Sequence, residues 1–486
     1  MLKNYYPSCL AISVSMLALS ACGTSMQARP VADLPPGVAG IWKSNGYGYV
    51  LDATEEYPRL FHHTLEFCVE DTDTAALLSY YLTPDNLAYD SEGRAIYFSP
   101  TLEDYKIELQ SIPRRPQTCG LELASDPLTV FDSFASYMDT HYAFFDLYDV
   151  DWKKAAAASR QNISSKTTDG ELADILAELI EPIQDAHLSL ELKVKGKERV
   201  LNPGRSSVGN ALRRIAERDG TSIKKLNNQM MQQYWMTDVK KDILNGDGKM
   251  MADDMIQFGI VSDNIGYIAI AAEAGYAGKG EYSEDADLAV LNETLDQAIS
   301  TFNEASAKAV IIDLSVNFGG YDFISRAIAE RFAVQPSLAY TKYAADSSNQ
   351  TPYPISITPY AGSRYTGPVV LVTSNVTVSA GEMLTMALRT QPNVTHVGET
   401  TRGAHSDVLE KKLPNGWRLK LSNEVYHDHE GKFWEGRGIP PHVPMQIFKP
   451  DNPFEGHVEA ILSIIDRIDK GEFSAPSSSK PHHRGK

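Results

Sequence analysis

Two apolar runs in the second half of the chain constrain its fold more than any other feature. "AVIIDL" (309–314) and "PVVLVTS" (368–374) have the length and continuous apolar character of buried strands. The first leads through Gly319-Gly320 into the helical pattern "YDFISRAIAERF", and the second leads into a helix that begins near Ser379. Alternation of strands and helices is typical of an α/β fold, and we place this core at residues 256–470.

The segments ahead of the core differ from it and from each other. Residues 36–122 carry short Tyr-, Phe- and Val-bearing runs broken by Gly, Asp and Pro, which predicts a small all-β domain. Residues 126–200 show aromatic and aliphatic residues at helical spacing, which predicts a helical N-terminal subdomain. Residues 201–255 are polar and have no clear pattern, so we interpret them as a linker or as an insertion over the functional site.

Within the helical subdomain, one helix and one strand can be placed from their patterns. Thr168 and Glu171 form a capping box ahead of an apolar helix face, and this helix ends near Pro182. The following "DAHLSLELKV" alternates like a strand with one buried face. His187 lies at this helix-to-strand junction, at a position that belongs to the polar face of the strand. Farther along, Asn415-Gly416 between two alternating runs predicts a hairpin.

The first residues indicate export and a lipid anchor. Residues 1–21 combine an early lysine with an apolar stretch too short to span a bilayer, as in a secretion signal. The end of this stretch, Leu19-Ser20-Ala21-Cys22, resembles the bacterial lipobox, in which the cysteine is lipidated. Gly23 follows, not the aspartate that favours the inner membrane, so we expect an outer-membrane lipoprotein that faces the periplasm. A plain signal peptide with an incidental cysteine is the alternative.

Further expectations follow from this location and from composition. Residues 22–35 are small, polar and proline-bearing, as in a tether, and residues 471–486 form a low-complexity tail that we expect to be disordered. Cys68 and Cys119 remain after export, and an oxidising periplasm favours a disulfide between them. The formal charge of −18 argues against a nucleic-acid partner, because binding of phosphates needs a clustered basic surface.

Ser379 allows two interpretations. Ser379-Ala380-Gly381-Glu382 is an S-x-x-E capping box, and most such boxes only begin helices. The same geometry would place the hydroxyl at a helix N-terminus, where free amides and the helix dipole stabilise an oxyanion. The local sequence does not decide between a capping residue and a nucleophile.

Several separated strings, taken in order, favour the nucleophile. They are "AVIIDLSVNFGG", "VVLVTSNVTVSAGEML", "THVGETTRGAH", "KLPNGWRLKLS" and "FWEGRGIPPHV". Together they resemble the core motifs of the tail-specific, or C-terminal processing, serine protease family. The upstream strings "FDSFASYMDTHYAFF" and "LIEPIQDAHLSL" are similar to the tricorn-like and retinoid-binding-protein-like branch of that family. The resemblance implies a crotonase-like αββα core and a peptidase activity.

The resemblance assigns roles to particular residues. Ser379 matches the nucleophile, and Ala380 matches the residue whose amide helps to form the oxyanion hole. Gly319 and Gly320 match the glycine pair that completes this hole, and glycine lets backbone donors approach a developing negative charge closely.

The base differs from that of relatives with a serine-lysine dyad, because their lysine position is Ala404 in this chain. In the tricorn-like branch a D-x-H string supplies a histidine base, and Asp185-Ala186-His187 matches it. Glu435 in "WEGRG" matches the carboxylate that orients this histidine, so His187, Ser379 and Glu435 form a complete acyl-transfer set. The branch has a second serine where this chain has Ala186. His405 is a rival base, for which we expect a solvated loop position.

The sequence thus predicts a serine endopeptidase or carboxyl-terminal processing peptidase that forms an acyl-enzyme on Ser379. Its partners would be a peptide or protein substrate and the membrane, and neither a metal nor an organic cofactor is implied. The alternative function is a non-catalytic protein that binds a small apolar ligand or a partner on the same fold, as retinoid-binding relatives do.

Overall fold

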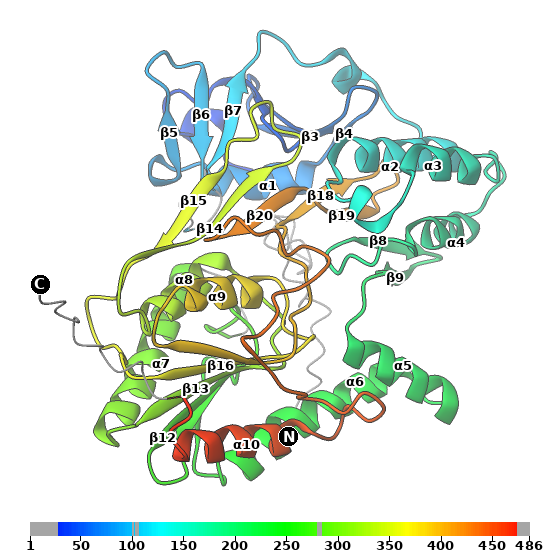
Figure 1. The fold of residues 1–486 in the computed structure, drawn as a ribbon. Helices are drawn as coiled ribbons and strands as arrows, with labels where there is room; N and C mark the ends of the chain where they lie inside the picture. Colours follow the sequence, from blue (N-terminus) through cyan, green and yellow to red (C-terminus); the bar gives the residue numbers. More distant parts are fainter. Residues whose placement is uncertain (1–27, 100–101, 103–105, 279–283, 474–486) are drawn as a thin grey trace, which may run out of the picture.

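The structure is a computed structural model that describes residues 28–99, 102, 106–278 and 284–473. The predicted signal peptide, Cys22 and residues 474–486 of the predicted tail lie outside these residues. The N-terminal domain lies above the α/β core, and the helical subdomain lies beside it (Figure 1). Within the described ranges, no helix combines the length and the apolar character needed to cross a membrane.

The N-terminal domain is an antiparallel sheet of order β4-β3-β2-β1-β7-β6-β5. Its strands are β1 (Gly40–Ser44), β2 (Tyr49–Ala53), β3 (Arg59–His63), β4 (Cys68–Glu70), β5 (Leu87–Tyr89), β6 (Ala95–Phe98) and β7 (Ile107–Ser111). Short 3-10 turns are η2 (Val31–Asp33), η3 (Pro84–Asn86) and η4 (Gln117–Gly120). A disulfide joins Cys68 at the start of β4 to Cys119 in η4, so it links the last turn of the domain to its sheet.

This domain also contains a helix that the sequence did not predict, α1 (Thr72–Tyr81), packed on β3. The Asp71 side chain accepts the Thr74 amide and caps the helix. Residues 74–79 are all buried, so α1 has no polar face along its middle and lacks the periodicity that reveals a half-exposed helix. The domain is therefore a β-sheet covered by one helix, and not purely β.

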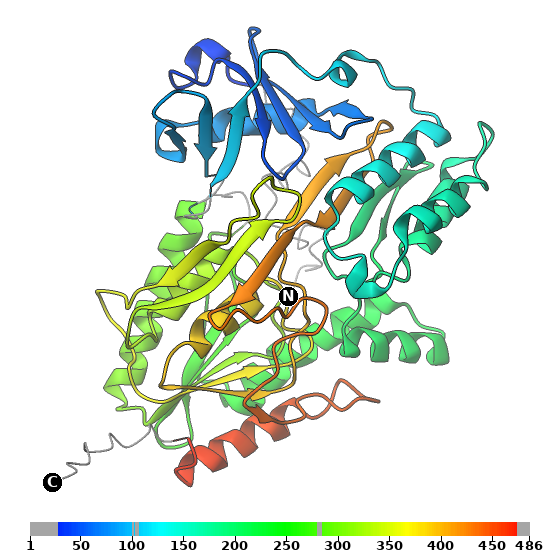
Figure 2. The same ribbon diagram turned by 45° about the horizontal axis from the view of Figure 1, so that its top comes forward.

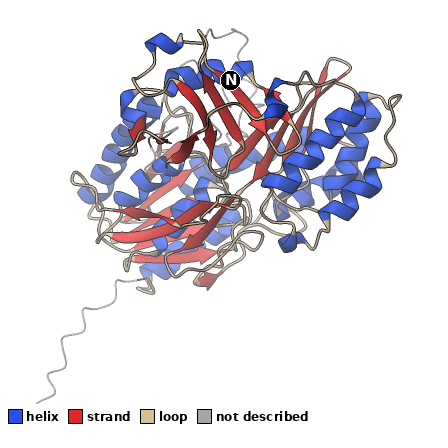
Figure 3. Cartoon of the chain, turned by 90° about the horizontal axis from the view of Figure 1, so that it is seen from above, coloured by secondary structure: helices blue, strands red, loops and turns tan. Residues whose placement is uncertain are grey.

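The helical subdomain consists of α2 (Pro127–His141), the 3-10 turn η5 (Asp146–Tyr148), α3 (Trp152–Arg160) and α4 (Asp169–Ile180). Seen from above, these helices form a group beside the strands (Figure 3). The capping box of Thr168 and Glu171 is present at the start of α4, as predicted. The sheet of order β18-β19-β8-β9 joins this subdomain to the rest of the chain; its strands are β8 (Ser189–Val194), β9 (Lys197–Leu201), β18 (Val408–Lys412) and β19 (Arg418–Ser422).

The β18–β19 hairpin runs between the N-terminal domain and the helical subdomain (Figure 2). Pairing of β19 with β8, at Lys420 opposite Ser189, sets the position of the junction that carries His187. Apolar residues of both units and of the hairpin form one continuous hydrophobic cluster. Burial of this shared apolar surface holds the helical subdomain against the N-terminal domain and the hairpin.

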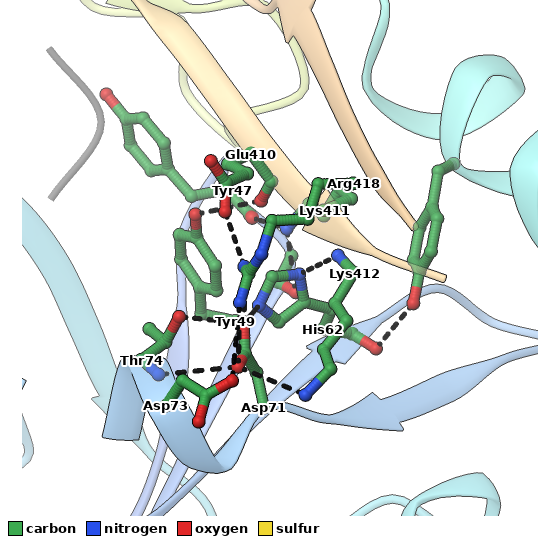
Figure 4. A network of polar contacts seen from close by, with 12 residues as sticks. Tyr47, Tyr49, His62, Asp71, Asp73, Thr74, Glu410, Lys411, Lys412 and Arg418 are labelled. Carbon is green, nitrogen blue, oxygen red and sulfur yellow. Dashed lines mark hydrogen bonds and ion pairs between the residues drawn. The ribbon is translucent and has the colours of Figure 1, made fainter. Parts of the chain in front are cut away.

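A buried polar network fixes the N-terminal domain to the same hairpin (Figure 4). Asp71 accepts from Arg418 at 2.9 Å and lies 3.3 Å from His62 Nε2, while Lys412 donates its amide to His62 Nδ1 at 2.8 Å. Burial lowers the pKa of His62 to about 4, so the ring is neutral at physiological pH and its Nδ1 accepts the Lys412 amide.

The α/β core is built on a sheet of order β10-β11-β12-β13-β16-β17-β21. Its strands are β10 (Lys249–Met251), β11 (Ile256–Val261), β12 (Ile265–Ile270), β13 (Ala309–Leu314), β16 (Val369–Thr373), β17 (Val394–Gly398) and β21 (Val443–Pro444). Strands β12, β13, β16, β17 and β21 run parallel, so their carboxyl ends lie at one edge of the sheet. Ligands of open parallel sheets bind at that edge.

Helices cover both faces of this sheet. One face packs with α7 (Glu284–Glu304), α8 (Asp322–Glu330) and α9 (Ala380–Arg389), and beyond these helices lies the sheet of order β15-β14-β20, formed by β14 (Ser337–Ala344), β15 (Tyr353–Ile357) and β20 (Glu424–Asp428). The other face packs with α5 (Ser207–Asp219), α6 (Ile223–Gln232), the π-helix η6 (Gln233–Ile243) and α10 (His457–Asp469). Residues 207–243 are therefore helices of the core, and not an insertion over the site.

Candidate active site

Ser379 begins α9 in a backbone conformation that few residues other than glycine adopt. Its φ is 58° and its ψ is −128°. The Glu382 amide donates to the Ser379 carbonyl oxygen at 2.7 Å and the Glu382 carboxylate accepts the Ser379 amide at 3.3 Å, so the predicted capping pair of Ser379 and Glu382 is present. The Ser379 amide in turn donates to Ala404 O at 3.1 Å. A strained serine held from both sides is a common feature of functional sites.

Gly319 packs directly against this serine. A Cβ built at Gly319 would lie 2.5 Å from Ser379 Cβ and 3.0 Å from the Ala380 nitrogen, and its φ of +75° also favours glycine. Gly320 has φ +155°, and a Cβ there would lie 2.4 Å from the carbonyl carbon of Glu273. The glycine pair therefore brings its loop into van der Waals contact with the start of α9, as its sequence position predicts.

The amides around Ser379 do not all have the same role. The Gly319 amide already donates to Asn317 Oδ1 at 2.9 Å, so in this structure it is not free to bind an oxyanion, which corrects the assignment made from the sequence. The amides of Gly320 and Ala380 have no acceptor among the described residues. Two free backbone donors beside a serine at a helix N-terminus can stabilise a tetrahedral oxyanion.

A buried carboxyl supports this loop from behind. Glu273 Oε1 accepts from Asn317 Nδ2 at 2.8 Å, and Asn317 also donates to Ile270 O at 3.0 Å. Burial raises the pKa of Glu273 to about 8, against the opposing effect of the Asn317 hydrogen bond. The sequence analysis missed Glu273 and Asn317, because their pairing spans 44 residues and only Asn317 lies within a quoted string.

His187 lies in the helical subdomain, between α4 and β8. Asp185 is buried and accepts the His187 amide at 2.8 Å and the Tyr142 hydroxyl at 3.0 Å. Asn202 donates to Ala186 O at 2.8 Å and holds the same turn from the other side. The ring nitrogen Nδ1 of His187 is buried and has no hydrogen-bond partner among the described residues.

Glu435 and His405 form a second buried group. Glu435 Oε2 accepts the amides of His405 and Ser406 at 2.9 and 3.1 Å, while its Oε1 is buried without a described partner. Burial raises the pKa of this carboxyl against the opposing effect of His405, and His187 acts in the same direction as His405. Within the described part of the chain, no hydrogen bond or ion pair joins His187 to Glu435 or to Ser379.

His405 is buried, with 3% of its surface exposed, and the expected solvated loop position is wrong. Its Nε2 lies 3.4 Å from Glu382 and its Nδ1 lies 3.7 Å from Glu435. Burial lowers the pKa of the ring, but these two carboxylates outweigh burial and raise the pKa above its ordinary value. His405 is therefore a buried ring between two carboxylates that favour its protonated form.

Glu382 organises the loop of residues 401–404. It accepts the amides of Gly403 and Ala404 at 2.7 and 2.8 Å and the Thr401 hydroxyl at 2.5 Å. These bonds tie the loop after β17 to the first turn of α9. Ala404 is buried, and its carbonyl oxygen holds the Ser379 amide.

Comparison with known proteins identifies the core. Residues 264–445 match the sequence model of peptidase family S41. This part of the chain is similar to peptidase family S41. The S41 region includes Ser379, the glycine pair and Glu435, whereas His187 lies ahead of it.

Two curated proteins are similar to parts of this chain. A stretch of 174 residues is 24% identical to a Chlamydia pneumoniae protein, covering 34% of this chain and 28% of that protein. A stretch of 154 residues is 25% identical to the carboxy-terminal processing protease CtpA of Bacillus subtilis (strain 168), covering 32% of each chain. The chain thus spans about a third of the length of these curated relatives.

A solved structure extends the likeness beyond the S41 region. A candidate peptidase of Parabacteroides merdae ATCC 43184 superposes with a TM-score of 0.53 at 23% identity, covering 71% of this chain and 96% of that one. The mixed α/β fold with several sheets and helices is therefore shared with this solved structure, in agreement with the fold class that the sequence indicated.

Proposed function

We propose that the protein is a serine peptidase, an endopeptidase or carboxyl-terminal processing peptidase, that forms an acyl-enzyme on Ser379. The observation that carries the proposal is the strained Ser379 at the N-terminus of α9, with the unpaired amides of Gly320 and Ala380 beside it. A capping serine needs neither the positive φ nor the glycine loop against its Cβ. Together these features supply a nucleophile and an oxyanion hole.

His187 is the proposed base. Its buried Nδ1 and the buried Oε1 of Glu435 both lack partners, and electrostatic interaction between the two residues supports their proximity. A small movement of the helical subdomain toward the core on substrate binding would pair them and turn Nε2 toward Ser379, since catalytic hydrogen bonds often tighten only in the complex. His405 is less suitable, because the two carboxylates beside it favour the protonated ring, and that form cannot accept a proton.

The proposed chemistry is acyl transfer. His187 takes the Ser379 hydroxyl proton as Oγ attacks the scissile carbonyl carbon, and the Gly320 and Ala380 amides donate to the oxyanion. The imidazolium then protonates the leaving amine, and a water activated by neutral His187 hydrolyses the ester. Glu435 stabilises the imidazolium, as an orienting carboxylate does in other serine hydrolases.

Labelling with a fluorophosphonate probe tests this proposal. The purified soluble chain, residues 23–486, should be labelled in the wild type and in a Gln110→Ala control on the exposed end of β7. Labelling should be lost in Ser379→Ala and reduced by about a hundredfold or more in His187→Ala, in line with the size of general-base effects. No labelling of folded wild type between mildly acidic and alkaline pH would favour the alternative, a binding protein on this fold.

We further propose that the protein is anchored by a lipid on Cys22 in the cell envelope, in the outer membrane and facing the periplasm. Support comes from the lipobox-like sequence and the Cys68–Cys119 disulfide, which fits an oxidising compartment. Metabolic labelling with a palmitate analogue should mark the wild type but not Cys22→Ala. Equal labelling of both would overturn the anchor.

A further inference from the structure

Arg402 lies between the two halves of the candidate site. Its amide donates to Thr377 O at 2.8 Å, two residues before Ser379, so its backbone belongs to the core. Its guanidinium interacts electrostatically with Glu382 of the core and with Tyr148 and Asp185 of the helical subdomain. The backbone of Arg402 thus lies beside the loop of the nucleophile, while its charge acts on groups in both halves of the site.

The Arg402 guanidinium is half-buried and makes no hydrogen bond or ion pair with any described residue. Burial lowers its pKa to about 10, so the group remains charged at neutral pH. A guanidinium that has lost much of its hydration without gaining an anion is energetically costly. Its planar set of donors matches a carboxylate in two parallel hydrogen bonds.

The nearby carboxylates do not need Arg402 as a partner, because each has donors of its own. Glu382 accepts two amides and a hydroxyl, and Asp185 accepts the Tyr142 hydroxyl and the His187 amide. Arg402 is the cationic group that these interactions leave without an anionic partner in the described part of the chain. An arginine that served only to neutralise the acidic groups would be expected within ion-pair distance of one of them.

A second donor lies near the same place. The Tyr148 hydroxyl, at the end of η5, also has no hydrogen-bond partner among the described residues, although the side chain is half-buried. Electrostatic interactions link it to Asp185, Glu435 and Arg402. The two halves of the site thus each supply a donor, a hydroxyl and a guanidinium, that has no partner among the described residues.

We propose that Arg402, assisted by the Tyr148 hydroxyl, binds a carboxylate of the substrate beside Ser379, so that the enzyme selects peptides with a negative charge near the scissile bond. The inference rests on the proposed peptidase function, since it names the substrate class of the same site. The carboxylate has two possible sources: the free C-terminus of a peptide, or an Asp or Glu side chain.

Calorimetric titration of the Ser379→Ala variant separates this inference from the catalytic proposal, because binding is read without turnover. The probes are two matched peptide pairs: acetyl-Ala-Ala-Ala-Ala as free acid or amide, and acetyl-Ala-Glu-Ala-Ala amide or its Gln counterpart. At least one negative peptide should bind about tenfold more tightly than its neutral partner, in keeping with a charge-assisted hydrogen bond. Whichever pair shows the difference identifies the source.

The same titrations with Ser379→Ala/Arg402→Gln should abolish the preference, and Arg402→Lys should restore part of it. Tyr148→Phe should reduce it by a smaller factor, which keeps the inference testable if an Arg402 variant fails to fold. Equal binding within both pairs in the parent, or a preference that survives Arg402→Gln, would overturn the inference. Absence of fluorophosphonate labelling in the wild-type protein would instead count against the proposed function alone.

Discussion

Replacement of His457 by glutamine should change the pH dependence of stability in a direction that the structure fixes. His457 begins α10 and is buried, with Nε2 2.9 Å from Asp313 and Nδ1 3.7 Å from Asp238. Burial lowers the pKa of this ring, but the two carboxylates outweigh burial and raise it to about 9. The rings of Tyr234 and Phe448 pack against it and carry no charge at neutral pH.

The sign follows from linkage between protonation and folding. A histidine has a pKa of about 6.5 in an unfolded chain, so the folded state binds the proton more tightly. The resulting stabilisation is complete below about pH 6.5 and is lost as pH rises through about 9. A shift of this size, from about 6.5 to about 9, corresponds to about 3 kcal/mol at about 1.4 kcal/mol for each pKa unit.

Urea unfolding followed by tryptophan fluorescence at pH 6 and pH 10 measures this difference. The free energy of unfolding that His457→Gln loses should be about 3 kcal/mol larger at pH 6 than at pH 10. His429→Gln, at an exposed turn position, provides a control with no such change. A loss that is the same at both pH values would refute the reasoning, because Asp313 and Asp238 would then not hold a proton on the ring.

Other perturbations have equally defined outcomes. Gly320→Ala should abolish fluorophosphonate labelling, since its Cβ would meet the Glu273 carbonyl at 2.4 Å and displace an oxyanion donor. In the wild type, labelling should decline above about pH 8, where the Glu273 carboxyl ionises beside the glycine loop. Glu273→Gln should preserve labelling near neutral pH and show a smaller decline above about pH 8. Lys411, buried against Tyr47 O with a pKa lowered to about 7, makes stability rise with pH between about 7 and 10.5, and Lys411→Met should remove this rise in urea titrations. Removal of the Cys68–Cys119 disulfide, which closes a loop of 51 residues, should lower the unfolding free energy by up to about 4 kcal/mol in the same assay.

Much of the core could be predicted because its signals are local. The runs that became β13 and β16, the glycine pair and the S-x-x-E string at Ser379 are each contiguous in the sequence. The hairpin at Asn415-Gly416 and the capping box of α4 follow from chemistry within a few residues. Such features require no knowledge of distant contacts.

The remaining features depend on contacts that sequence patterns do not encode. His405 is buried because Glu382 and Glu435, 23 residues before and 30 residues after it, enclose its ring. The Gly319 amide donates to the Asn317 side chain, and that side chain donates to Glu273, which follows a different strand of the core sheet. The proposed role of Arg402 depends on the absence of an anionic partner for its guanidinium among the described residues, which only the structure shows. Helices 207–243 escaped prediction because their polar composition masked a narrow apolar face.

The most direct test of the central claim is a crystal structure of the protein with a peptidyl phosphonate bound covalently to Ser379. The account predicts the phosphonyl oxygen within hydrogen-bond distance of the Gly320 and Ala380 amides. It also predicts His187 Nε2 within reach of Ser379 Oγ, with Nδ1 paired to Glu435. A phosphonate on Ser379 with His187 still remote, or with His405 turned toward the serine, would contradict the account.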